Sequence, residues 1–98
     1  MANQQHLDKL REGVDAWNHW RRDHPHITPD LSGAELTGAN LQRTNLTGAN
    51  LRDASLLRAN LTEASFDGAD LRHANLAEAN LAGTSFDDAI LEWCLGCP

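Results

Sequence analysis

Two cysteines near the end of the chain have the spacing of a metal or redox site. Cys94 and Cys97 form a Cys-x-x-Cys pair, which provides half of the ligands of a structural zinc ion. No second such pair exists, and of the five histidines only His73 lies in the same half of the chain. We therefore expect no metal site and free thiols. Two cysteines cannot form a disulfide framework for the fold, which points to a reducing compartment.

Serine and aspartate, which act as nucleophile and acid or base in many hydrolases, recur along the chain. No Gly-x-Ser-x-Gly elbow and no separate base accompany the three serines, which are Ser55, Ser65 and Ser85. Paired carboxylates can form a glycosidase site or bind a divalent cation, and three candidates are Asp67, Asp87 and Asp88. Such sites are normally enclosed, so we interpret these residues as a solvated face. The sequence predicts no enzyme and no cofactor.

The dominant feature of the sequence is a five-residue repeat that runs from residue 29 to residue 93 without an insertion. With the first unit centred on Leu31, the central residue is leucine or phenylalanine in all thirteen units. Repetition this strict indicates a repeat protein. The predicted core consists of these centres: Leu31, Leu36, Leu41, Leu46, Leu51, Leu56, Leu61, Phe66, Leu71, Leu76, Leu81, Phe86 and Leu91.

Neither an α-helix nor a continuous strand accommodates a period of five. On a helix five residues advance by about 500°, so the centres would form no stripe. On a strand an odd period would place successive centres on opposite faces. The chain must instead turn once per unit and stack its coils at about 4.8 Å, which predicts an all-β solenoid. Glycine ends five units, and the asparagine, aspartate or serine before most centres can bond to the backbone at each bend.

The number of sides in a coil follows from markers that are 20 residues apart. Phe66 and Phe86 are the only aromatic centres and have this separation. Two pairs of opposite charge share it, namely Arg43 with Glu63 and Arg58 with Glu78. Four units per coil would stack each of these pairs, which favours a four-sided coil, while a three-sided coil stays open.

The unit resembles the A(D/N)LXX motif of the pentapeptide-repeat proteins. Typical examples are Gly-Ala-Asn-Leu at 38–41 and Gly-Ala-Asp-Leu at 68–71, and the resemblance covers about two thirds of the chain. It implies a right-handed quadrilateral β-helix, here of about three coils. The residues around Trp17 also look like the leader of small cyanobacterial members. Four residues depart from the consensus: Pro29, Thr44, Thr84 and Ile90.

The residues before the repeat predict one capping helix from about Asn3 to His24. Asn3 can cap its start, and Pro25 disfavours helix beyond His24. Because a solenoid leaves an open ring at each end, we expect the apolar stripe of this helix to cover the first coil. The alternative is a helix that binds in the groove of a partner. The stripe lies within an arc of about 80° and consists of Leu7, Leu10, Val14 and Trp17.

The chain divides into a capping helix and linker (1–28), a repeat region (29–93) and a tail (94–98). The tail is too short for a capping helix, so we expect no comparable cover over the last coil. Apolar residues gather at this end: Ile90, Leu91, Trp93 and Leu95. We expect the end to bind protein, either a second copy, which gives a homodimer, or another chain that continues the coil. On the outer walls Leu57 is the one apolar anchor candidate.

The charge of the chain limits its partners. Its 98 residues include 14 Asp and Glu against 8 Lys and Arg, and residues 1–28 carry four of each sign. Without a basic cluster, direct nucleic-acid binding is not expected. No apolar run reaches the roughly 20 residues of a membrane helix, and no signal peptide is evident. We predict a non-enzymatic cytoplasmic module that is structural or binds protein.

An alternative function comes from the resemblance alone. Some larger pentapeptide-repeat proteins are acidic mimics of duplex DNA that act on DNA gyrase or topoisomerase. Three coils would give a rod of only about 15 Å, against about 34 Å for one turn of DNA. Four arginines also interrupt the acidic surface: Arg43, Arg52, Arg58 and Arg72.

Overall fold

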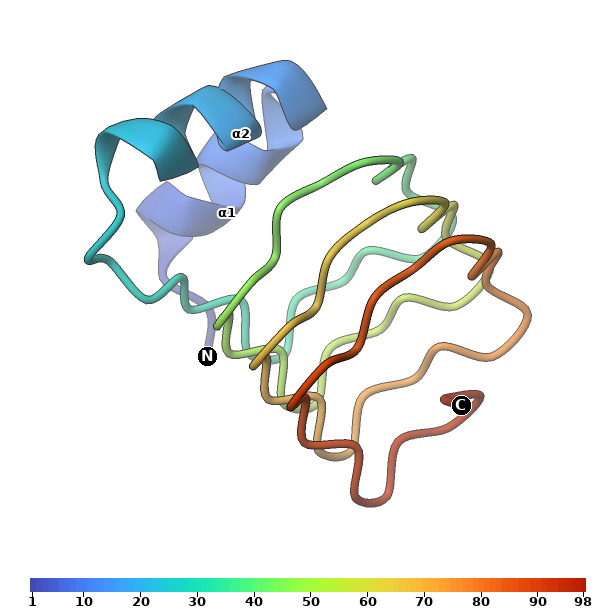
Figure 1. Cartoon of the computed structure of the whole chain (residues 1–98). Coiled ribbons are helices and arrows are strands. Elements are labelled where there is room, and N and C mark those ends of the chain that lie inside the picture. The colour runs from blue at the N-terminus through green and yellow to red at the C-terminus, as the bar shows by residue number, and fades with distance from the viewer.

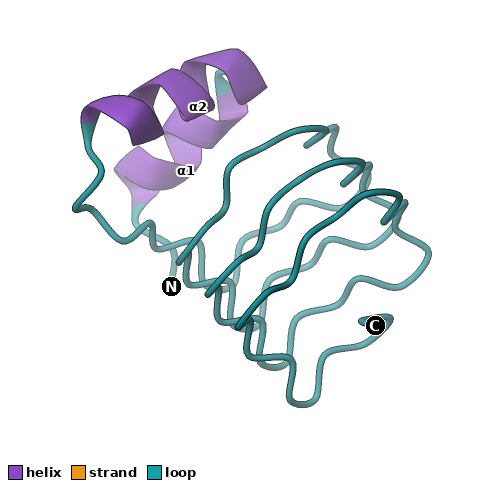
Figure 2. Cartoon of the chain, in the orientation of Figure 1, coloured by secondary structure: helices purple, strands orange, loops and turns teal.

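The computed structural model describes all 98 residues as two helices followed by a regularly coiled segment. Helix α1 spans Gln4–Arg11 and helix α2 spans Val14–Asp23. The two helices lie side by side at one end of the stacked coils (Figure 1). The coiled segment begins near residue 29, and the chain reaches its last residue at the opposite end of the stack (Figure 2). Neither helix has the length and apolar content needed to cross a lipid bilayer.

The expectation of one capping helix is wrong, because the chain breaks at Gly13. Gly13 has φ of 123°, a conformation that a helix cannot contain and that glycine adopts most readily. The apolar spacing continues across the break, so the pattern alone could not reveal it. The predicted ends are confirmed. The Asn3 side chain accepts from the backbone N–H groups of Gln5 and His6, and α2 stops before Pro25.

The coils repeat every 20 residues, which confirms four units per coil and excludes three. Ten parallel bridges join residues that are 20 apart, from Asp30 with Asn50 to Asn75 with Leu95. Between coils the Leu31 N–H donates to the Asn50 carbonyl, and the Asn50 N–H donates to the Pro29 carbonyl, each at 2.8 Å. We name the four sides of the solenoid after their first-coil residues: the Asp30, Glu35, Asn40 and Asn45 sides.

No segment qualifies as a β-strand, which differs from the expected all-β class. Each unit contributes one bridged residue and then turns, so pairing never extends along the chain. In the first unit the Ala34 N–H donates to the Leu31 carbonyl at 3.0 Å and closes the turn. The solenoid is therefore built from turns and isolated bridges between them.

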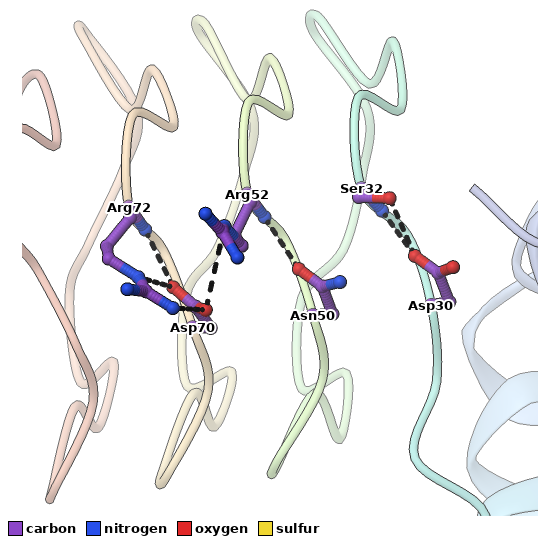
Figure 3. Close-up of polar contacts among 6 residues, drawn as sticks. All are labelled: Asp30, Ser32, Asn50, Arg52, Asp70 and Arg72. Atoms are coloured by element: carbon purple, nitrogen blue, oxygen red, sulfur yellow. Dashed lines mark hydrogen bonds and ion pairs between the residues drawn. The ribbon is translucent and has the colours of Figure 1, made fainter. Parts of the chain in front are cut away.

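Every turn places its third residue in the left-handed region. The residue two positions after each centre has φ between 58° and 71°, whether it is glycine, as at Gly68, or a larger residue, as at Glu63. A single positive φ at this position is typical of a type II turn. The polar residue before the centre then accepts from the N–H two residues on, as Figure 3 shows for Asp30, Asn50 and Asp70. The predicted role at the bends is thus confirmed for the asparagine and aspartate residues. Ser55 and Ser85 instead bond to side chains of the coil below, those of Thr37 and Asp67.

The residues that marked the period stack as expected. Phe66 and Phe86 lie with ring centroids 5.3 Å apart and planes 7° apart. The two charged pairs form exposed ion pairs between coils: Arg43 with Glu63 at 3.5 Å, and Arg58 with Glu78 at 3.3 Å. Contacts this exposed add little stability, so the register depends mainly on the apolar centres and the backbone bonds.

The predicted centres form the core, although not equally at both ends. Ten centres from Leu31 to Leu76 are buried, together with most of the alanines beside them. The last three centres, Leu81, Phe86 and Leu91, are half-buried because no coil covers them. The solenoid also extends past the expected boundary at residue 93, since Leu95 bridges Asn75 as a regular coil residue.

Candidate interaction surface at the C-terminal end

The N-terminal edge of the first coil is closed on the Asp30 side by the segment around α1. The Asn3 N–H donates to the Asp30 carbonyl at 2.9 Å, and the Asp30 N–H donates to Nδ1 of His6 at 3.0 Å. These bonds replace those that a preceding coil would make. His6 also packs against Trp20, with ring centroids 5.2 Å apart.

Helix α2 closes the same edge on the Asn45 side. The Trp17 indole N–H and the Arg21 guanidinium both donate to the Asn45 carbonyl, at 2.8 and 3.0 Å, and Arg21 also donates to the Thr47 carbonyl at 2.7 Å. Asn18 accepts from the Asn45 N–H at 2.8 Å. Burial lowers the pKa of Arg21. These polar partners could not be predicted from the sequence, because only the apolar residues of the helices follow a regular spacing.

The stripe itself covers the core as predicted, with one exception. Leu7, Leu10 and Trp17 are buried in the same cluster as the first-coil centres, whereas Val14 is only half-buried. Val14 begins α2 directly after the break at Gly13, so it lies at the margin of the covered area.

The C-terminal edge of the last coil has no such partners on three sides. In the coil below, the N–H groups of Leu61, Phe66 and Leu71 donate to the next coil at 2.8 to 2.9 Å. The equivalent N–H groups one coil later make no backbone hydrogen bond, and they belong to Leu81, Phe86 and Leu91. Carbonyl groups at Ala79, Thr84 and Ala89 are also left without a backbone donor. The last coil therefore presents an unpaired backbone edge around a partly exposed core.

Large apolar side chains border this edge. Ile90 is 39% exposed, Trp93 67% and Leu95 62%. Ile90 stands where the coils below have Asp30, Asn50 and Asp70, so an apolar residue replaces the polar one of the repeat. The C-terminal end surface, as we use the term, comprises the exposed Ile90, Trp93 and Leu95 and the half-buried centres Leu81, Phe86 and Leu91. The predicted interaction residues at this end thus lie together.

Trp93 is held flat by the residue one coil below it. Its ring stacks on that of His73, with centroids 5.0 Å apart and planes 9° apart. Trp93 has φ of 58°, so it occupies the left-handed turn position that is glycine or a polar residue in the other units. The stack covers one face of the indole and leaves the ring two thirds exposed.

The expectation of free thiols is wrong, because Cys94 and Cys97 form a disulfide. Their Cα atoms lie 5.7 Å apart, within the range that a disulfide requires. Both cysteines pack against the core. Gly96 between them approaches the backbone of the coil below so closely that an added Cβ would lie 2.8 Å from Ala77 Cα. The tail therefore folds inward over the Glu35 side, where Leu76 is 1% exposed, and part of the end is covered after all.

The other residues with potential for chemistry form no such site. The Ser85 hydroxyl donates to the Asp67 carboxylate, which also accepts from the Asp87 N–H at 3.0 Å. The hydrogen bond from Ser85 is the first of the causes that lower the pKa of Asp67. No group of three His, Cys, Asp or Glu side chains is placed to hold a metal ion. Leu57 is half-buried on the outer wall of the solenoid, so it exposes less apolar surface to a partner than its position in the repeat suggested.

Comparison with known proteins agrees with this architecture. The family model described as "Pentapeptide repeats (8 copies)" matches residues 30–68 and 54–94. The chain therefore belongs to the pentapeptide-repeat family. No curated protein matches it in sequence.

Solved structures that are similar to this chain include two pentapeptide repeat proteins. A pentapeptide repeat protein from the thylakoid lumen of Arabidopsis thaliana is 40% identical, with a TM-score of 0.66 over 66% of this chain and 45% of its own. The pentapeptide repeat protein Rfr23 from the cyanobacterium Cyanothece 51142 is 42% identical, with a TM-score of 0.60 over 62% of this chain and 42% of its own. This chain thus spans less than half the length of either relative.

Proposed function

We propose that this chain is a non-enzymatic protein-interaction module, a right-handed quadrilateral β-helix that binds its partner through the C-terminal end surface. The single observation that carries the proposal is the contrast between the two ends. The first coil has its edge bonded by α1 and α2 on the Asp30 and Asn45 sides, while on its other two sides the N–H groups of Glu35 and Asn40 make no backbone bond. The last coil leaves N–H and C=O groups free on three sides, beside exposed Ile90, Trp93 and Leu95. Exposed apolar groups beside an open edge are typical of protein docking sites.

Two substitutions test the end without disturbing the fold. Ile90→Asn and Leu95→Asn introduce the type of residue that the coil below has at the same positions, Asp70 and Asn75. The double variant should fold normally but present a polar end. Leu57→Thr is a matched control, because it removes an apolar side chain from the outer wall and leaves the end intact.

A pull-down from a native extract compares these proteins. The proposal expects a partner that the wild type and Leu57→Thr retain and that the double variant loses. It would be wrong if the double variant retained the same partner as the wild type. The cytoplasmic location stays a prediction.

The sequence also predicts a homodimer through this end. Sedimentation of the wild type and of Trp93→Glu at tens of micromolar tests this directly. A homodimer that Trp93→Glu dissociates supports self-association, and a monomer in both cases contradicts it.

The DNA-mimic alternative finds no specific support in the geometry. The arginines that interrupt the surface are engaged with carboxylates, as in the Arg72 contact to Asp70 at 2.7 Å and the Arg43 contact to Glu63 at 3.5 Å. The whole molecule measures 31 Å along its longest axis, cap included. A supercoiling assay with gyrase tests the alternative, because a DNA mimic should inhibit the enzyme. Absence of inhibition by this chain would exclude the DNA-mimic function.

A further inference from the structure

We infer that the C-terminal end surface binds a segment of another protein that is extended and rich in arginine or lysine. The inference rests on the proposed function and adds the chemistry of the partner. Three features of the last coil carry it: its charge, the free face of Trp93 and its backbone edge.

All charged side chains of the last coil are acidic. From residue 74 onward the chain contains four acidic residues and no lysine or arginine. Glu78 is engaged by Arg58 at 3.3 Å, while Asp87, Asp88 and Glu92 form no ion pair. The nearest arginine, Arg72, is held by both oxygens of Asp70, at 2.9 and 2.7 Å. The apolar end is thus bordered by acidic groups that a basic partner would complement.

This charge also disfavours a second copy as the occupant. A two-fold homodimer places the same patch on both sides of the interface. Asp87, Asp88 and Glu92 would then face the acidic residues of the other copy, with no basic residue of the last coil to offset them. Like charges brought together across an interface oppose association.

Trp93 offers a specific place for a cation. One face of the indole lies on His73, and the ring is 67% exposed. A guanidinium or ammonium over an indole face is attracted by the ring quadrupole, and tryptophan is the best of the aromatic residues for this contact. Glu92 precedes Trp93 in the chain and adds a carboxylate beside the platform.

The backbone edge can pair with an extended segment on any one of its open sides. Each open side offers a free carbonyl and, two residues on, a free N–H group, as in Ala89 and Leu91, and the chain turns before the next side. An extended peptide can therefore add to one side at a time. The disulfide-closed tail does not obstruct these sides, since it packs over Leu76 and Ala77 on the Glu35 side. The other three sides remain open.

Two blocked peptides of equal length test the inference by amide NMR. Both alternate valine with a charged residue, which is arginine in one and glutamate in the other. We expect the arginine peptide to shift the amides of Leu81, Phe86, Leu91 and Trp93, and the glutamate peptide to leave them unchanged. Added salt should weaken the binding.

Matched variants distinguish binding that depends on the acidic residues from nonspecific apolar binding. Asp88→Asn combined with Glu92→Gln should weaken the arginine peptide about tenfold. Asp53→Asn removes the same charge at the same left-handed turn position, with φ of 62° against 60° at Asp88, and should change nothing. Trp93→Asn removes the platform with a residue that tolerates positive φ, and should weaken binding further.

Each other outcome overturns the inference in a distinct way. If both peptides bind the end equally, the partner need not be basic, although the proposed function stands. If neither binds and sedimentation shows a dimer, the occupant is a second copy. If neither binds and the chain is monomeric, both the inference and a docking role of this end for extended chains are wrong.

Discussion

The indole N–H of Trp17 donates to the backbone carbonyl of Asn45 at 2.8 Å, and the Trp17 side chain is completely buried. One residue of α2 thus fills the open core of the first coil and bonds to its edge. No residue does the same for Phe86 and Leu91 at the other end. The function we propose follows from this asymmetry.

Replacement of Trp17 should separate its two roles. Trp17→Phe keeps an aromatic ring but loses the hydrogen bond, while Arg21 still donates to the same carbonyl. We expect a decrease of about 1 kcal/mol in the free energy of unfolding. Trp17→Ala also empties the space over the first coil and should cost about 3–5 kcal/mol. Urea unfolding measures both values, and a loss below about 1 kcal/mol for Trp17→Ala would show that the helices do not cap the solenoid.

Thr44 and Thr84 occupy the position that is usually alanine, but only one of them has a hydrogen bond. The Thr44 hydroxyl is fully buried without a partner, whereas the Thr84 hydroxyl donates to the Leu61 carbonyl at 2.7 Å. Thr44→Val should therefore raise the free energy of unfolding by about 1 kcal/mol, and Thr84→Val should lower it by a similar amount. Thermal unfolding of the two variants checks the opposite signs. Equal effects would mean that the two hydroxyl groups have the same environment.

Acid should destabilise the protein through its hydrogen-bonded carboxylates. Hydrogen bonds from the Arg72 side chain hold the pKa of Asp70 below its ordinary value of 3.8, and similar bonds lower the pKa of Asp30, Glu35 and Asp67. A carboxylate with a lowered folded pKa stabilises the fold above its unfolded pKa, and this contribution disappears as the pH falls through the folded value. We expect the urea midpoint to decline from about pH 4 downward.

Asp70→Asn tests this origin of the acid dependence. Asn keeps the acceptor for the Arg72 N–H but loses the charge, so the decline at low pH should be shallower than in the wild type. Asp53→Asn removes a charge that has no ion pair and serves as the control. An identical acid profile for the wild type and Asp70→Asn would contradict the assignment.

Reduction of the Cys94–Cys97 disulfide should open one side of the end. The Leu76 N–H donates to the Leu95 carbonyl at 2.7 Å beneath the tail, while the Leu71 N–H donates to the Ile90 carbonyl at 2.9 Å, outside it. In reductant we expect faster hydrogen exchange at Leu76 and little change at Leu71. Gly96→Ala should act similarly, because its Cβ would meet the Ala77 backbone. Unchanged protection of Leu76 would show that the tail is held without the disulfide.

The sequence predicted the part of the fold that repeats. Phe66 and Phe86 favoured a 20-residue coil, which the bridges between coils then confirmed, and the interior position of the leucines followed from the period alone. The features that could not be predicted from the sequence each occur only once in the chain, so no repeat reveals them. The break at Gly13 leaves the apolar spacing intact, Asn18 and Arg21 are ordinary surface residues in any helical pattern, and the inward turn at Gly96 depends on contacts with Ala77. Exposure of Ile90, Trp93 and Leu95 was predictable, because the repeat is strict up to the point where they interrupt it.

Hydrogen exchange at Leu81, Phe86 and Leu91 shows whether the last coil is the docking site, because these backbone N–H groups make no backbone hydrogen bond in the structure. Exchange is measured for the chain alone and with the arginine peptide. We predict fast exchange in the chain alone and slowed exchange in the complex. The Glu35 and Asn40 amides of the first coil, which also make no backbone bond, should not change. Protection that appears at Glu35 and Asn40 instead, with the last coil unaffected, would contradict this prediction.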